Sequence, residues 1–171
     1  MISQHAADVL ARRIVDGAQS ATELDIEQIV QRIATAPFEP REVTVPPDWR
    51  GLFYLGRELG PREPSLFVHL FTRVVVERQW MFGTTAEQYL ADVRGAVGVA
   101  ETRIAAYRRR GGAIIAALAE TERVVAPPRR GIKTEPYLLV VYSADRGIIV
   151  SGYQASGLET LAMPGDARWL K

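Results

Sequence analysis

A histidine and an arginine lie one helical turn apart in an otherwise apolar stretch, FVHLFTRVVVERQW, at residues 67–80. On a helix, His69, Arg73 and Glu77 share one face, whereas Arg78 points away from it. Histidine transfers protons near neutral pH, and the guanidinium of arginine binds phosphate through several N–H groups. The three residues therefore suggest acid–base chemistry on a phosphate group. A packed histidine beside an Arg73–Glu77 salt bridge is the structural alternative.

A second polar group lies in a late apolar stretch, IIVSGYQ. Ser151 and Tyr153 alternate with Gly152 and so share one face of a strand, and Gln154 follows them. A tyrosine at this place can donate a proton or stack on a nucleic-acid base, and it can equally cap the edge of a core. Ser151 and Gln154 would supply hydrogen bonds to a substrate.

Basic residues cluster in the second half of the chain. Residues 103–133 hold eight basic and two acidic side chains, although the net charge of the chain is only +1. All but two of the 21 basic residues are arginines, whose planar guanidinium suits phosphate. Arg108, Arg109 and Arg110 form either a solvated charge run or a set of phosphate contacts. The clustering predicts an anionic partner, with nucleic acid first.

The composition excludes several kinds of site. The chain has no cysteine and only two histidines, His5 near the N-terminus and His69. Disulfides, thiolate zinc sites and cysteine nucleophiles are therefore ruled out, and neither a histidine-rich metal site nor a cofactor is expected. The sequence also lacks the glycine-rich nucleotide loops, the serine-hydrolase elbow and the zinc-protease motif.

Charged residues interrupt the apolar segments well before they reach the roughly 18 residues that a membrane span requires. Asp8, Arg12, Arg13 and Asp16 likewise break any signal-peptide core. We therefore expect a cytoplasmic protein that does not bind membranes.

Helices are predicted where apolar residues recur at helical spacing. They cover residues 3–18, 23–35, 67–80 and 85–97. The third would also suit a strand, because it contains three consecutive valines. Thr84 and Glu87 have the spacing of a capping box for the fourth. Prolines between residues 37 and 48 indicate a connector, which divides the chain into an N-terminal helical extension (1–48) and an α+β core domain (49–171).

Strands are predicted mainly in the C-terminal half, apart from a short segment at residues 51–59. Gly111 and Gly112 indicate a two-residue hairpin loop after a first strand. Residues 113–125 are rich in alanine and suit either a strand or a helix. Residues 136–154 predict a hairpin that turns at Gly147, with two strands that are apolar on both faces and so should be central in a sheet. Trp169 and Leu170 are expected to dock back on the core.

Residues 66–154 resemble the superfamily that groups barnase, EndoU, the colicin ribonucleases and RelE-type toxins. A helix carries His69, Arg73 and Arg78, a second helix (TTAEQYLADVRGAV) follows, and paired strands end in VVYSADRGIIVSGYQ. The resemblance implies helices packed on one face of a roughly four-stranded antiparallel sheet. It also implies a metal-independent, toxin-like ribonuclease with a neutralising, antitoxin-like partner. The scarcity of lysine and the extra residues 1–48 depart from this pattern.

The resemblance also implies a mechanism. The 2′-OH of RNA attacks the neighbouring phosphorus while a base removes its proton and an acid protonates the leaving oxygen. His69 would be the base or the acid, and Arg73 would stabilise the charge on phosphorus. Tyr153 would be the second proton donor or a stacking platform, and Ser151 a hydrogen-bond donor. Substrate binding would fall to Gln154 and four arginines, namely Arg78, Arg108, Arg109 and Arg110.

Two other functions fit the same residues. The sheet and its arginines can hold RNA or a partner protein without cleaving anything. Alternatively, the chain is a structural partner whose N-terminal helices form a homodimer. Leu10, Ile14, Ile29 and Ile33 would then be buried between the two subunits. Three observations distinguish these hypotheses. A ribonuclease cleaves RNA, a binding module retards RNA on a gel without cleaving it, and a structural partner elutes as a stable dimer.

Overall fold

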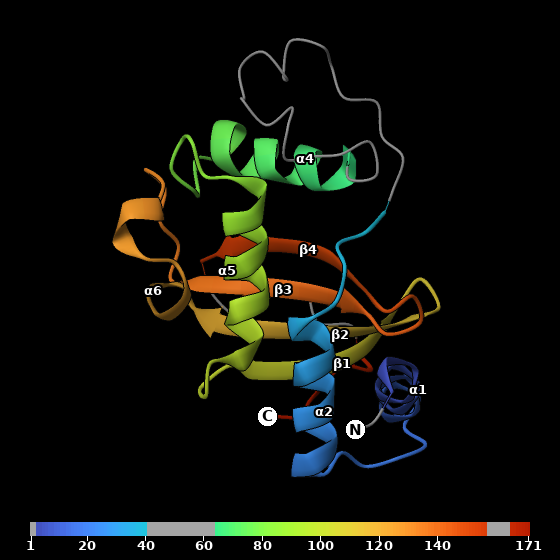
Figure 1. Cartoon of the computed structure of the whole chain (residues 1–171). Coiled ribbons are helices and arrows are strands. Elements are labelled where there is room, and N and C mark those ends of the chain that lie inside the picture. Colours follow the sequence, from blue (N-terminus) through green and yellow to red (C-terminus); the bar gives the residue numbers. More distant parts are fainter. Residues whose placement is uncertain (1–2, 41–63, 157–164) are drawn as a thin grey trace.

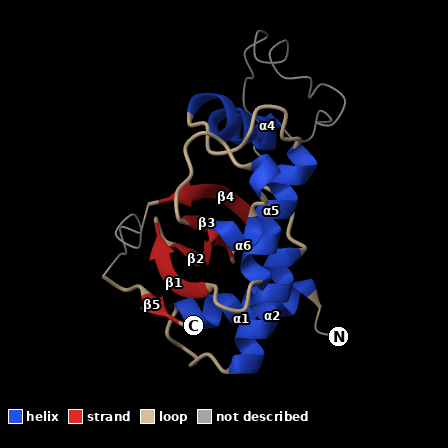
Figure 2. Cartoon of the chain, turned by 90° about the vertical axis from the view of Figure 1, so that its left-hand side faces the viewer, coloured by secondary structure: helices blue, strands red, loops and turns tan. Residues whose placement is uncertain are grey.

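A computed structural model describes residues 3–40, 64–156 and 165–171 of the chain. Five strands form one antiparallel sheet in the order β4-β3-β2-β1-β5, and helices cover one of its faces (Figures 1 and 2). The strands are β1 (Arg103–Arg109), β2 (Gly112–Glu120), β3 (Tyr137–Ser143), β4 (Ile148–Ala155) and β5 (Arg168–Trp169). The predicted α+β class is confirmed, and the C-terminal tail supplies the fifth strand by pairing with β1.

The helices begin and end close to their predicted limits. They are α1 (Gln4–Val15), α2 (Glu23–Ala34), α4 (Pro64–Phe71), α5 (Ala86–Gly98) and the single turn α6 (Thr121–Val124). The stretch that contains His69 is helical, as predicted, but α4 continues as a π-helical segment, η1 (Thr72–Val76), and ends before Trp80. Among the described residues, every helix is too short or too polar to pass through a bilayer.

The capping box of α5 lies one residue later than predicted. The hydroxyl oxygen of Thr85, not Thr84, accepts the backbone N–H of Gln88 at 3.1 Å, and the Gln88 side chain accepts the N–H of Thr85 at 3.0 Å. Thr84 instead is buried and donates its hydroxyl to the Met81 carbonyl at 2.8 Å. Glutamine at the third helical position replaces Glu87 in this role.

Two predictions about the sheet need correction. The hairpin loop between β1 and β2 consists of Arg110 and Gly111, not of the two glycines. Residues 113–120 form a strand, which is one of the two alternatives left open for residues 113–125, and the short helix α6 follows. β4 lies at an edge of the sheet, not in its middle. Its edge is nevertheless covered. Phe38 pairs with Ile149, and α4 runs beside the strand (Figure 1).

The N-terminal helices pack into the core of the same chain. Ile14, Ile29 and Ile33 are at most 1% exposed and belong to the hydrophobic cluster that also contains the helix-facing side chains of the sheet. Leu10 packs against this cluster. These side chains are therefore not available for the dimer interface predicted from the sequence. The proposed domain boundary at residue 48 lies outside the described residues, as does the predicted strand at 51–59.

Candidate functional site

The guanidinium of Arg73 lies over the aromatic ring of Tyr153, with 4.8 Å between its Cζ atom and the ring centroid. Arg73 comes from η1 and Tyr153 from the edge strand β4, so the fold joins two segments that are distant in the sequence. Arg73 also forms an ion pair with Glu77, at 2.5 Å between Nη1 and Oε2. Two of the four residues predicted to be catalytic are therefore in direct contact.

The Arg73 side chain is largely buried, with 15% of its surface exposed. Its Nε atom is buried and has no hydrogen-bond partner among the described residues. An unsatisfied buried donor is unfavourable, and a guanidinium N–H binds a phosphate oxygen strongly. Arg73 thus combines a fixed orientation with donor capacity that the described protein atoms do not use.

His69 precedes Arg73 by four residues and is half-buried. Its ring meets the ring of Phe38 edge to face, with 5.0 Å between the centroids. Phe38 comes from the segment that pairs with β4. The histidine is therefore at the same covered edge of the sheet as Arg73. The π-helical geometry that follows it is a local departure from the α-helix that occurs often at functional sites.

A tyrosine of the predicted helix at residues 85–97, which is not among the predicted site residues, lies beside this group. The Tyr89 hydroxyl, on α5, donates to the carbonyl of Gly152 at 2.6 Å and is fully buried. Burial raises the pKa of the Tyr89 phenol, and the nearby positive charge of Arg73 opposes this shift. Tyr89 belongs to the helix-side core, whereas Tyr153 belongs to the cluster on the opposite face. Arg73 consequently lies at the edge of β4, between the two faces.

Ser151 and Tyr153 share the sheet face opposite the helices, as their alternation predicts, and both are half-buried. The same face carries Tyr107 of β1. Burial raises the pKa of Tyr107, Arg109 lowers it, and Tyr153 raises it further. Electrostatic interactions therefore link Arg109, Tyr107 and Tyr153 on one face of the sheet.

The predicted binding residues Gln154, Arg108 and Arg110 are not among the residues that form the ion pair and the ring contact with Arg73. Gln154 is 2% exposed, and its side-chain amide donates to the Gln79 carbonyl and accepts the Glu135 N–H. Arg108 pairs with Asp16 of the loop after α1 and donates to the Gly111 carbonyl at 2.8 Å. Arg110 is exposed at the hairpin tip. We leave Gln154 and Arg108 out of the candidate site, since their polar atoms are already bound within the protein.

Arg78 lies at the end of η1, on the surface. Its backbone is in the left-handed region, with a φ of 57°. Its side chain lines an apolar pocket together with Trp80, Met81 and Ile132. His69, Arg73 and Tyr153 do not line this pocket. Arg78 is therefore separate from the group around Arg73, in agreement with its expected orientation on the helix.

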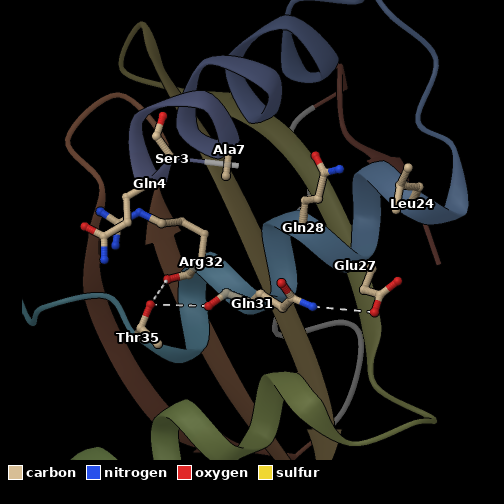
Figure 3. A pocket seen from close by; sticks show the side chains of 9 residues that line it. All are labelled: Ser3, Gln4, Ala7, Leu24, Glu27, Gln28, Gln31, Arg32 and Thr35. Atoms are coloured by element: carbon tan, nitrogen blue, oxygen red, sulfur yellow. Dashed lines mark hydrogen bonds between the residues drawn. The ribbon is translucent and has the colours of Figure 1, made fainter. Parts of the chain in front are cut away.

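A polar pocket of about 440 Å³ lies between α1 and α2 (Figure 3). Arg32 is the only basic side chain among its lining residues. It already binds the Asp8 carboxylate, at 3.1 Å, and the Gly147 carbonyl, at 2.9 Å. Most of the hydrogen-bonding capacity of Arg32 is therefore already used within the protein, so the pocket has little left with which to bind an anion. Nor do the described histidine, aspartate and glutamate side chains come together in threes to hold a metal ion.

Comparison with known proteins gives no matching family model, no matching curated protein and no matching solved structure. The resemblance to the barnase, EndoU, colicin and RelE superfamily stays a prediction.

Stability should fall at alkaline pH, because burial raises the pKa values of Tyr89 and Tyr142 in the folded chain. Unfolded tyrosines lose their protons at about pH 10, whereas the folded chain retains them. The stabilisation is complete below about pH 10 and is lost as the pH rises through the folded pKa values. Urea denaturation at about pH 8 and about pH 11 measures the fall. Tyr89→Phe and Tyr142→Phe should each make this loss of stability between the two pH values smaller. A loss as large in both variants as in wild type would contradict the prediction.

Proposed function

We propose that the protein is a metal-independent endoribonuclease with its active site around Arg73, at the edge of β4. One observation carries the proposal. The resemblance assigns Arg73 and Tyr153, from two distant segments, to the same reaction, and the Arg73 Cζ atom lies 4.8 Å from the centroid of the Tyr153 ring. Transesterification of a phosphodiester uses charge stabilisation, which Arg73 can supply, and proton transfer, which Tyr153 and a histidine four residues before Arg73 can supply.

Arg73 has the role of stabilising the negative charge that develops on the phosphoryl oxygens. Its ion pair with Glu77 fixes the direction of the guanidinium, so little reorganisation is needed when a phosphate binds. The N–H groups of this guanidinium would donate to a phosphoryl oxygen. Glu77 is in this account a positioning residue.

Proton transfer falls to His69 and Tyr153. One removes the proton of the attacking 2′-OH, and the other protonates the leaving 5′-oxygen. Histidine is the side chain whose ordinary pKa suits either task near neutral pH. Ser151 lies on the same sheet face as Tyr153 and would donate a hydrogen bond to the bound strand. Arg109 and the exposed Arg110 would contact more distant phosphates.

Purified wild type, incubated with an RNA of defined sequence in the presence of chelator, should release fragments that end in a 2′,3′-cyclic phosphate. His69→Ala should lower the cleavage rate by about a hundredfold or more. Arg73→Lys keeps the charge but removes the planar set of donors, and should lower the rate by about a hundredfold. Arg123→Lys is the matched control, because Arg123 is an exposed surface arginine that pairs with Glu101 and Glu120.

Intact RNA after prolonged incubation with wild type, or equal rates in wild type and both site variants, would overturn the proposal. Binding of RNA without cleavage is the second candidate. It is favoured by the edge-to-face contact of His69 with Phe38, which occupies part of the imidazole surface. In that case RNA is retarded on a gel, with a steep dependence on salt, and is not shortened.

A further inference from the structure

The apolar pocket beside Arg78 has a volume of about 380 Å³ and lies where η1 ends, away from Tyr153. Valine side chains of η1 and the indole of Trp80 line it. Met81, Phe82 and Ile132 also line it and are 52%, 69% and 85% exposed. Val76, which follows the lining residue Val75, is 64% exposed. Three of the six large hydrophobic side chains that are exposed in the described residues thus line this pocket.

Hydrogen bonds and close packing between residues 78–81 and 129–133 fix the backbone around this pocket. The N–H of Met81 donates to the Arg129 carbonyl at 3.0 Å, and the N–H of Lys133 donates to the Arg78 carbonyl at 3.0 Å. A Cβ atom at Gly131 would lie 2.0 Å from the Arg78 carbonyl oxygen, so the two segments meet too closely for a larger residue. A preorganised apolar surface loses little entropy when a partner binds.

The charges at this surface are positive. Arg78 and Arg130 line the pocket, and none of its lining residues in the described part of the chain is acidic. Arg130 is paired with Glu122, which is 79% exposed and reaches it from α6. Lys133 follows the lining residue Ile132, is 66% exposed and pairs with Glu135 at 3.7 Å. A matching ligand therefore has an apolar side chain, which contacts the apolar lining, next to carboxylates, which pair with the basic side chains.

We propose that this surface binds an acidic segment of a partner protein. One leucine, methionine or phenylalanine of that segment would enter the pocket, and a neighbouring carboxylate would pair with Arg78. Exposed apolar patches with a polar rim mark protein-binding sites, and a central apolar anchor usually carries most of the affinity. The site is separate from the proposed RNA-cleaving residues, and the inference does not depend on them.

The full chain should be tested by selection from a random-peptide display library. We expect the selected peptides to share a large apolar residue flanked by aspartate or glutamate. Binding of such a synthetic peptide, measured by fluorescence anisotropy, should weaken by at least about tenfold in Ile132→Asp and in Arg78→Glu. Leu24→Asp is the matched control, because Leu24 is 62% exposed on α2 and does not line this pocket. Both Ile132 and Leu24 are exposed enough for the aspartate to leave the fold intact.

Three results would each overturn the inference. The selection returns no peptide, or returns peptides without acidic residues. The selected peptides bind Ile132→Asp and Arg78→Glu as well as they bind wild type. The purified chain elutes as a dimer that Ile132→Asp disperses, in which case a second copy of the chain occupies the surface.

Discussion

Asp8→Ala should lower the free energy of unfolding by about 3–5 kcal/mol. The Asp8 carboxylate on α1 accepts the hydroxyl of Tyr142 on β3 and pairs with Arg32 on α2 at 3.1 Å. Arg32 in turn donates to the carbonyl of Gly147, in the turn between β3 and β4, at 2.9 Å. Only 13% of Asp8 and 10% of Arg32 is exposed. Loss of the carboxylate would leave a buried guanidinium without its counter-ion, which is the costly case for buried ion pairs.

Chemical denaturation of three variants tests this prediction. Asp16→Ala is the control, because Asp16 also pairs with an arginine of a distant element, Arg108, but both side chains are more than 40% exposed. Its loss should cost at most about 1 kcal/mol. The double variant Asp8→Leu with Arg32→Met removes both charges and should be more stable than Asp8→Ala alone. Equal effects of Asp8→Ala and Asp16→Ala would show that burial of the network contributes nothing.

Helix positions could be predicted from sequence because local signals determine them. Thr22 and Thr85 each provide an N-cap, and apolar residues follow at helical spacing in α2 and α5. The β3–β4 hairpin is likewise local, since Gly147 adopts a φ of 66° between two β-branched segments. Choosing Thr84 rather than Thr85 as the cap was a one-residue error, because both threonines have an acid or amide three residues later.

Tertiary packing determines the strand conformation of β2 and the edge position of β4, and the sequence pattern does not indicate that packing. The alanines of β2 favour a helix in isolation, but in the sheet they leave room for helices to pack closely on the strand, and the core fixes the strand conformation. β4 is apolar on both faces, a pattern typical of central strands. It occurs here on an edge strand because α4 and the Phe38 segment cover that edge.

The sequence could suggest members of the candidate site but not their arrangement. The spacing of His69, Arg73 and Glu77 gives a shared helix face, which the Arg73–Glu77 ion pair agrees with. The contact of Arg73 with Tyr153 depends on α4 lying beside β4, and a single sequence contains no signal for that. The structural roles of Asp8, whose side chain is 13% exposed, and of the buried Asp92 were also not predicted. Asp92 had a signal, because it lies among Tyr89, Val93 and Ala96, which form the buried face of α5.

Asp92→Ala should lower the free energy of unfolding by about 3 kcal/mol. Asp92 is 3% exposed and accepts the indole N–H of Trp80 at 3.0 Å. It also pairs with Arg129, whose side chain is 33% exposed. Removing the carboxylate leaves the fully buried indole donor unsatisfied and breaks a charge-assisted pair, although Arg129 can still reach water.

Two further variants separate these contributions. Asp92→Asn keeps an oxygen acceptor for Trp80 but loses the charge that binds Arg129, so its cost should be smaller than that of Asp92→Ala. Glu122→Ala is the control from the same region, because Glu122 pairs with Arg130 but is 79% exposed, and it should cost at most about 1 kcal/mol. Urea denaturation followed by tryptophan fluorescence measures all three. An Asp92→Asn variant that is less stable than Asp92→Ala would contradict this account, because the acceptor for Trp80 could then not be the main contribution.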